Sequence, residues 1–215
     1  LKSSNFNPLP YWSHGVQMVA TNWQTYDLGQ QLNEALFENK IFQGYVLKPS
    51  VLRKPTLKSS SNNVDTRTSL TTTNSKTIRF NFEIISGHQL PKFPKDDYKD
   101  QAINPYISFE IIGAQDVQWA NNDSSPIAPT TSSSPFIRTT KIIRENGFNP
   151  NFNTKFSGSI ITTTNDLIFI KFVVYASTSL NYPDYGENFP IAILVTKLNY
   201  LKQGYRYIYL NDLLG

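Results

Sequence analysis

Apolar and polar positions follow one pattern in the first quarter of the chain and a different pattern afterwards. Residues 16–23 form a largely apolar, partly β-branched run, which is typical of a buried strand. Apolar residues then recur at helical spacing up to about Glu38, which predicts an amphipathic helix with Thr25 or Asp27 as its N-cap. Residues 44–47 indicate a second short strand. The order strand, helix, strand predicts a βαβ unit, the building block of parallel sheets and barrels.

From residue 77 onward the apolar residues have the period of two that is typical of half-buried strands. Gly, Pro, Asn or Asp bounds each run, and no run has a convincing helical pattern. About seven short strands without a helix predict an antiparallel β-sandwich. The strand candidates are residues 77–86, 105–112, 137–143, 154–161, 167–175, 191–198 and 205–210.

Two stretches lack the apolar residues that would let them pack. Residues 56–76 are rich in Ser, Thr and Asn, so burial cannot offset the entropy cost of ordering them. We expect this stretch to be a flexible linker at a domain boundary. Residues 116–135 have a similar composition, and we expect a long, disordered surface loop there.

Composition narrows the functional classes only modestly. The formal net charge of +4 and the pI near 9.1 suit contact with an anionic surface. The chain has no cysteine, which excludes disulfides and cysteine metal sites and favours a reducing, intracellular setting. No apolar run approaches the roughly 20 residues of a membrane span, so any membrane contact is expected to be peripheral. No basic stripe with interleaved aromatics is present, and we expect no nucleic-acid partner.

Several longer runs, in a fixed order, resemble the phosphoinositide-specific phospholipases C of eukaryotes. The first three match the end of the Y region, which is the second half of the catalytic barrel in that family. The last three match the C2 domain that follows the barrel. The runs are residues 3–8 (SSNFNP), 15–25 (GVQMVATNWQT), 44–49 (GYVLKP), 83–91 (EIISGHQLP), 145–150 (ENGFNP) and 201–206 (LKQGYR).

The resemblance implies a mixed fold: the C-terminal βαβ end of a (β/α)8 TIM-like barrel, followed by an antiparallel β-sandwich, the C2 domain. The implied boundaries are residues 1–55 for the barrel end, 56–76 for the linker and 77–215 for the C2 domain. Relatives continue into one more strand after the residues that correspond to 212–215. We therefore expect this chain either to lack that strand or to be followed by it.

The resemblance also implies a function. The family hydrolyses phosphatidylinositol 4,5-bisphosphate to diacylglycerol and inositol 1,4,5-trisphosphate, using two histidines, a calcium ion held by carboxylates, and basic residues. These groups correspond to positions upstream of Leu1. We therefore expect a phosphoric diester hydrolase of intracellular signalling as the parent protein. For this chain we expect no catalytic, cofactor-binding or metal-binding residue, and no activity alone.

The alternative is a non-catalytic C2-type module, derived from such an enzyme, that binds a membrane or a protein. For either reading the expected location is cytoplasmic and peripheral at phosphoinositide-containing membranes, with a nuclear fraction as an open alternative. The C2 domain itself is expected to make at most a weak lipid or protein contact.

The two histidines and the ends of the predicted barrel strands are the remaining places for chemistry. His14 and His88 each lack a partner for acid/base work, so we interpret both as surface or turn residues. Active sites of barrels gather at the C-terminal ends of the strands. Lys48 there could add positive charge near lipid phosphates, and Gln24 could hydrogen-bond into the site. The favoured interpretation is that Thr25 and Asp27 cap a helix while Asn22 and Gln24 satisfy loop backbone. The residues at these strand ends are Asn22, Gln24, Thr25 and Lys48.

Calcium-binding C2 domains cluster several carboxylates at one end, because calcium takes six to eight oxygens. The resemblance implies that Asn104 and residues 176–178 (AST) stand where those relatives have aspartates, and Glu145 where they have an asparagine. We expect no ordinary calcium site here. A displaced, weaker site is an alternative, with Asp96, Asp97, Asp100, Asp184 and Glu187 as its candidate ligands.

The loops at the same end carry aromatic residues. Such residues either insert at a membrane interface or cover the end of the sandwich, and the sequence leaves both interpretations open. The residues are Phe93, Tyr98, Tyr182, Tyr185 and Phe189.

Overall fold

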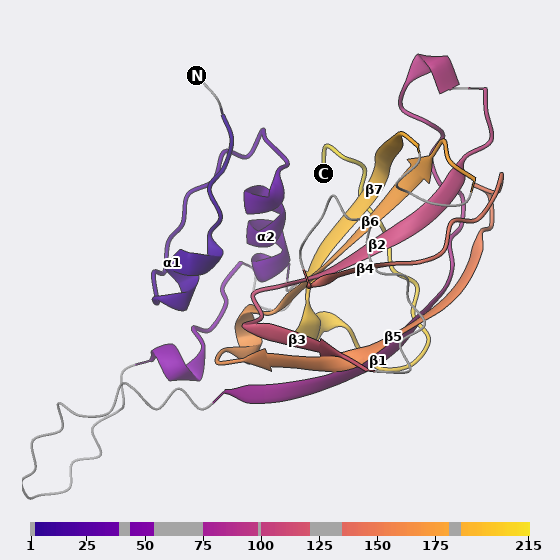
Figure 1. Ribbon diagram of the computed structural model, residues 1–215. Coiled ribbons are helices and arrows are strands. Elements are labelled where there is room, and N and C mark those ends of the chain that lie inside the picture. The colour runs from indigo at the N-terminus through magenta and orange to yellow at the C-terminus, as the bar shows by residue number, and fades with distance from the viewer. Residues whose placement is uncertain (1–2, 39–43, 54–74, 99, 121–134, 181–185) are drawn as a thin grey trace, which may run out of the picture.

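The computed structural model describes residues 3–38, 44–53, 75–98, 100–120, 135–180 and 186–215 (Figure 1). Most of the predicted linker and most of the predicted 116–135 loop lie outside these residues. Two layers of strands form the larger body, and two short helices stand beside it (Figure 1).

The larger body is an antiparallel β-sandwich, as the period of two predicted. One sheet has the order β1-β5-β3 and the other β4-β2-β6-β7, and every strand pair within them is antiparallel. The strands are β1 (Lys76–Ser86), β2 (Asn104–Ile112), β3 (Asp116–Trp119), β4 (Ile137–Thr139), β5 (Asn151–Thr162), β6 (Phe169–Ser177) and β7 (Asn188–Lys197).

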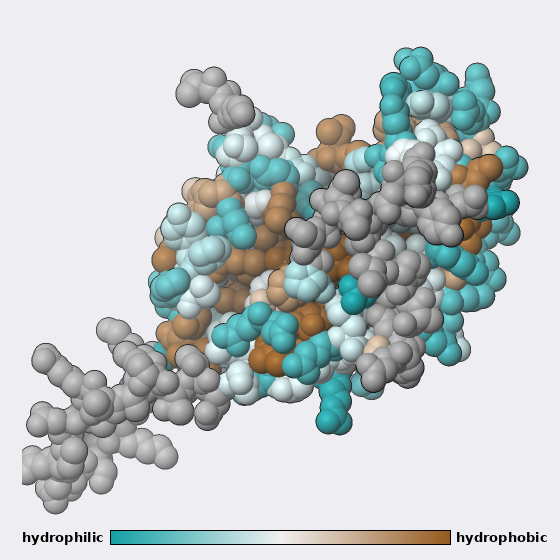
Figure 2. All heavy atoms as spheres, in the orientation of Figure 1, coloured by the Kyte–Doolittle hydropathy of each residue, from teal (hydrophilic) through white to brown (hydrophobic). Residues whose placement is uncertain are grey.

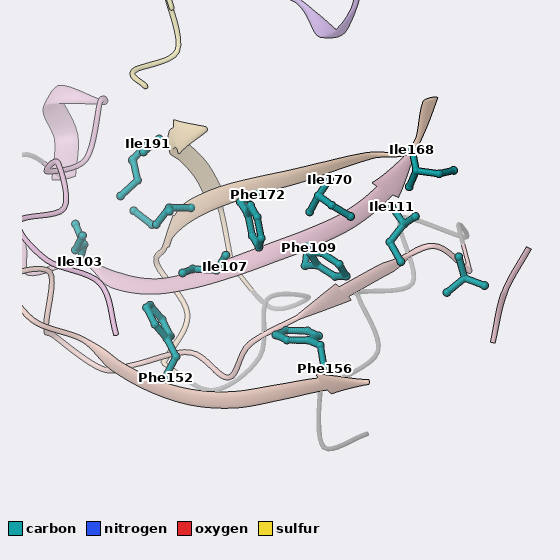
Figure 3. Close-up of a cluster of buried hydrophobic side chains, with 14 of the residues drawn as sticks. Ile103, Ile107, Phe109, Ile111, Phe152, Phe156, Ile168, Ile170, Phe172 and Ile191 are labelled. Carbon is teal, nitrogen blue, oxygen red and sulfur yellow. The ribbon is translucent and has the colours of Figure 1, made fainter. Parts of the chain in front are cut away.

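The core lies between the two sheets and consists mainly of isoleucine and phenylalanine side chains (Figure 3). Phe82 faces Phe156 across β1 and β5, with their rings stacked at 5.1 Å, and Phe109 faces Phe172 across β2 and β6. The Phe82 and Phe109 rings meet edge to face across the two sheets at 4.7 Å. Alternation along each strand therefore delivers large rings to one continuous interior.

The N-terminal part (residues 3–38 and 44–53) contains α1 (Leu9–Ser13) and α2 (Leu28–Phe37). Helix α2 confirms the predicted amphipathic helix. Its N-cap is Asp27 rather than Thr25, since a side-chain oxygen of Asp27 accepts a hydrogen bond from the Gln30 backbone N–H. Short 3-10 helices complete the description: η1 (Ser50–Leu52), η2 (Asp96–Tyr98), η3 (Asn165–Leu167) and η5 (Leu198–Tyr200).

The two strands predicted on either side of α2 are corrected by the structure. Residues 16–23 and 44–47 form no strand. A strand of a parallel barrel exists through hydrogen bonds to neighbouring strands, and none of the described residues pairs with these segments. The helix can form from its local pattern, whereas the strands depend on partners.

Two further segments of the sandwich differ from the sequence prediction. β3 lies at the start of the predicted 116–135 loop and pairs with β5, because Val117 is buried and the Trp119 ring packs against Phe80. The last predicted strand, residues 205–210, forms no strand. There the chain makes only an isolated bridge, in which Asn211 pairs with Ile193.

Candidate functional site

The first functional feature is the seam between the N-terminal part and the sandwich. Helix α2 lies along β7 (Figure 1), and its apolar stripe, with Leu32 fully buried, packs on the outward side chains of the β4-β2-β6-β7 sheet. From that sheet come Phe169 and Val195, and the Trp12 ring stacks on Phe169 at 6.3 Å between centroids. This apolar seam fixes the N-terminal part on the sandwich.

A polar contact closes the same seam near the end of the chain. The Asn211 side-chain amide donates a hydrogen bond to the phenolic oxygen of Tyr26 at 3.0 Å, and Gly215 lies against the Tyr26 ring. Burial raises the pKa of Tyr26, and the hydrogen bond from Asn211 opposes that shift. The phenol therefore stays neutral and serves as a structural partner.

The turn after residues 16–21 is held by one asparagine. The Asn5 amide donates to the backbone oxygens of Asn22 and Thr25, at 3.2 and 3.0 Å, and its backbone N–H donates to Asp27 at 2.7 Å. Burial alone would raise the pKa of Asp27. The hydrogen bonds that its carboxylate accepts from Asn5, Gln30 and Gly29 outweigh burial and lower this pKa. The Asn22 side chain satisfies loop backbone, since its amide donates to the Ser3 carbonyl oxygen at 3.0 Å, whereas Thr25 does not cap the helix.

The other candidates of the N-terminal part make local contacts. His14 is exposed, and its Nδ1 lies 2.6 Å from the Pro10 carbonyl oxygen. Gln24 is exposed, and the half-buried Lys48 places its Nζ beside Gly15. His88, in the sandwich, is exposed and lies 3.1 Å from the Ser86 hydroxyl. Each imidazole contacts its own turn.

The second functional feature is the tip of the sandwich, made by residues 87–98, 143–150 and 186–189 together with Asn104. The Asn104 side chain is buried and joins three segments at this end. Its Nδ2 donates to the Ser177 carbonyl oxygen and its Oδ1 accepts from the Glu145 backbone N–H, both at 2.9 Å. An aspartate could accept the second bond but could not donate the first.

The neighbouring positions are also engaged within the protein. The Ser177 hydroxyl accepts from the Ser179 backbone N–H at 3.1 Å, and the Thr178 hydroxyl accepts from the Glu187 backbone N–H at 2.9 Å. The Ser177 and Thr178 hydroxyls therefore fix the backbone of the tip loops.

Two of the acidic residues of the tip pair with a lysine. Glu187 faces the Lys95 ammonium at 3.3 Å, and Asp97 lies 4.0 Å from the same ammonium. Asp96 and Asp100 are exposed, and Asp184 lies outside the described residues. Among the residues that the structure describes, no group of three or more His, Asp or Glu side chains could hold a metal ion.

The aromatic residues of the tip cover the end of the sandwich. Phe93 is 5% exposed, and the rings of Phe93, Tyr98 and Phe189 lie 5.6 to 5.9 Å apart as one cluster. Of the two open interpretations, the structure favours covering over insertion for these three. Tyr182 and Tyr185 lie outside the described residues.

No helix in the described ranges combines the length and the apolar character that a membrane crossing requires. The relatives of this chain then decide its family. The family model described as phosphatidylinositol-specific phospholipase C, Y domain, matches residues 1–51. A Candida albicans protein named 1-phosphatidylinositol 4,5-bisphosphate phosphodiesterase 1 is 99% identical over all 215 residues of this chain. The chain belongs to the phosphoinositide-specific phospholipase C family.

Other members support the same assignment over nearly the whole chain. The human 1-phosphatidylinositol 4,5-bisphosphate phosphodiesterase delta-1 is 32% identical over 208 residues, which cover 97% of this chain and 23% of the relative. The crystal structure of S. officinalis PLC21 superposes with a TM-score of 0.59 at 25% identity, covering 98% of this chain and 22% of that chain. The predicted family and fold class, a barrel end followed by a C2 sandwich, are confirmed.

This chain spans about a fifth of the length of its relatives, 20% for the Candida albicans protein. Its first 51 residues match the Y domain, and the sandwich that follows is the C2 part of the confirmed fold class. Sequence reasoning missed Asn5 and the pair Tyr26–Asn211, because each acts through contacts across at least 17 positions of sequence. Only the N-cap at Asp27 had a local signal.

Proposed function

We propose that the parent protein hydrolyses phosphatidylinositol 4,5-bisphosphate to diacylglycerol and inositol 1,4,5-trisphosphate, and that this region is its non-catalytic scaffold. The observation that carries the proposal is the buried seam between α2 and the β4-β2-β6-β7 sheet. A barrel end that cannot pair its own segments is held in place by an independent sandwich. The C2 domain then acts as a rigid support for the barrel.

The chemistry itself belongs to residues outside this chain. Phosphodiester cleavage through a cyclic intermediate needs a paired acid and base, and each histidine here contacts only its own turn. A calcium ion in the parent active site would supply Lewis-acid stabilisation of the phosphate. The described residues do not fit that ion, since they offer no cluster of ligands for it.

The parent acts at phosphoinositide-containing membranes in this proposal, as a cytoplasmic protein that binds peripherally, with a nuclear fraction as an additional location. The domain division that goes with it is residues 1–55 for the barrel end, 56–76 for the linker and 77–215 for the C2 domain.

The decisive experiment measures water-soluble inositol phosphate released from vesicles that contain phosphatidylinositol 4,5-bisphosphate. The full-length parent should release it in the presence of calcium and lose this activity with a chelator. The chain of residues 1–215 alone should release none. Release by the short chain, or none by the folded parent, contradicts the proposal. Vesicle binding by a parent without hydrolysis would instead favour the non-catalytic C2 adaptor.

The scaffold role has its own test in the full-length parent. Leu32→Asp places a charge in the fully buried seam and should lower specific activity at least about tenfold, because the barrel end loses its support. The matched control is Phe148→Ala, which changes an exposed residue of the tip and should leave activity unchanged. Equal activity of both variants would exclude the scaffold role.

A further inference from the structure

One lysine at the tip is surrounded by groups that attract a cation. The Lys95 ammonium lies 3.3 Å from the Glu187 carboxylate and 4.0 Å from that of Asp97. It also lies over two aromatic rings, 5.5 Å from the centroid of Tyr98 and 5.8 Å from that of Phe189. Two loops contribute these partners, one before β2 and one at the start of β7.

The same loops meet beneath the ammonium. Phe93 and Tyr98 come from the first loop and pack against Phe189 of the second. The Glu187 backbone is itself fixed, since its N–H donates to the Thr178 hydroxyl. Lys95 therefore joins two segments that are 92 positions apart in sequence, above an aromatic contact between the same segments.

The composition of this cage selects an ammonium group over calcium. Calcium takes six to eight oxygen ligands at 2.3–2.6 Å. Here two sides of the cage are ring faces, which attract a monovalent ammonium through the ring quadrupole and offer calcium no oxygen. The Asn104 amide, at the base of the tip, is already satisfied by Ser177 and Glu145. The charge of Glu187 and its hydrogen bond to Lys95 raise the pKa of Lys95, so the ammonium is retained at neutral pH.

We infer that Lys95 is the built-in cation of the C2 tip, which holds the two loops together in place of a metal ion. The loop before β2 and the loop at the start of β7 are consequently held together without a bound ion or a membrane. This closure of the tip weakens with rising salt, because both carboxylate partners are partly exposed and screened by ions. Calcium leaves it unchanged.

The test uses residues 1–215 and compares Lys95→Met with the matched control Lys92→Met, which removes an exposed lysine of the same loop. Met keeps an unbranched apolar stem of similar length, so the main change is the ammonium. Amide hydrogen exchange at residues 95–98 and 187–189 reports closure. In K95M it should accelerate roughly two- to fivefold at low salt, the range that a surface ion pair with ring contacts supports.

Further outcomes test whether Lys95 holds the two loops together or is an ordinary exposed lysine. In the wild type, 1 M NaCl should accelerate the same amides and 1 mM calcium should not slow them. The variant Glu187→Gln should accelerate exchange less than K95M, because it removes one of the partners of Lys95 and leaves Asp97 and the two rings. The double variant should add little to K95M, because the Glu187 pair is already lost there. Equal exchange in K95M and K92M, or calcium protection of the wild-type loops, overturns the inference. Hydrolysis by the parent is not measured, so the result stands apart from the proposed function.

Discussion

The sandwich and the N-terminal part are both rich in apolar residues, but only the sandwich buries them within itself. Phe152, Phe156 and Ile160 are fully buried between its two sheets. In the N-terminal part, Met18 is 90% and Tyr45 is 82% exposed, and brown, apolar surface gathers over that part in Figure 2. The sandwich therefore has a closed core of its own, whereas the N-terminal part leaves large apolar side chains exposed.

The difference shows which kinds of element can form alone. Antiparallel strands close their hydrogen bonds with neighbours joined by short connections, and two such sheets enclose a core. Barrel strands require partners on both sides and a closed ring. In the N-terminal part the sandwich covers the α2 stripe and the Trp12 ring of α1. Substitutions should change stability most in the sandwich core, less in the seam and at Asn104, and least at Lys197.

The largest effect is expected in the core of the sandwich. Phe156→Ala removes a fully buried ring that stacks on Phe82, and it should lower the free energy of unfolding by about 3–5 kcal/mol. Chemical denaturation followed by near-UV circular dichroism measures this loss. The control Phe148→Ala, at a side chain 72% exposed, should change stability by less than about 0.5 kcal/mol. Similar losses in both would mean that the core is not the source of stability.

The seam should respond next. Leu32→Ala leaves a cavity between α2 and the sheet, and about 2–5 kcal/mol of stabilisation should be lost from the N-terminal part. Because the sandwich has its own core, limited proteolysis should cut residues 3–38 while the sandwich stays protected. Met18→Ala, at an exposed position, is the control. Simultaneous loss of both regions would show that they unfold as one unit.

A smaller effect is expected at Asn104. Asn104→Asp keeps the side-chain shape but removes the donor to Ser177 and turns a carboxylate toward its carbonyl oxygen, which should cost about 1–3 kcal/mol. Denaturation midpoints with and without calcium measure it. The variant should stay destabilised in 1 mM calcium. Recovery to wild-type stability would reveal a latent calcium site at the tip.

The smallest effect concerns Lys197, which is buried at the end of β7. Burial lowers its pKa, and the charge of Asp166 partly opposes this. A lysine whose folded pKa is below its unfolded pKa penalises the folded state at low pH, and stability rises as pH climbs from the folded pKa toward about 10.4. Lys197→Met lacks this penalty, so its stability advantage over wild type should narrow between pH 7 and pH 10. Parallel pH profiles of the two proteins would contradict the assignment.

Much of the fold followed from local patterns in the sequence. The alternation at Ile78, Phe80 and Phe82 predicts which side of β1 faces the core, and the stripe that includes Leu32 predicts the buried side of α2. Both patterns need only the period of the element and a preference for burial. The motifs of the chain also carried the family assignment, because long matches in series are specific.

Tertiary structure alone decided the rest. Residues 16–23 have the composition of a strand but lack partners, and β3 has the composition of a loop but pairs with β5. Strand formation depends on neighbours distant in sequence, which a local window does not contain. The roles of Asn104 and Lys95 depend in the same way on distant partners, since hydrogen bonds and charge pairs act over a few ångströms of space. The sequence by itself determined helix α2, most strands of the sandwich and the family. The packing determined which of the remaining segments form strands and what the polar residues of the tip do.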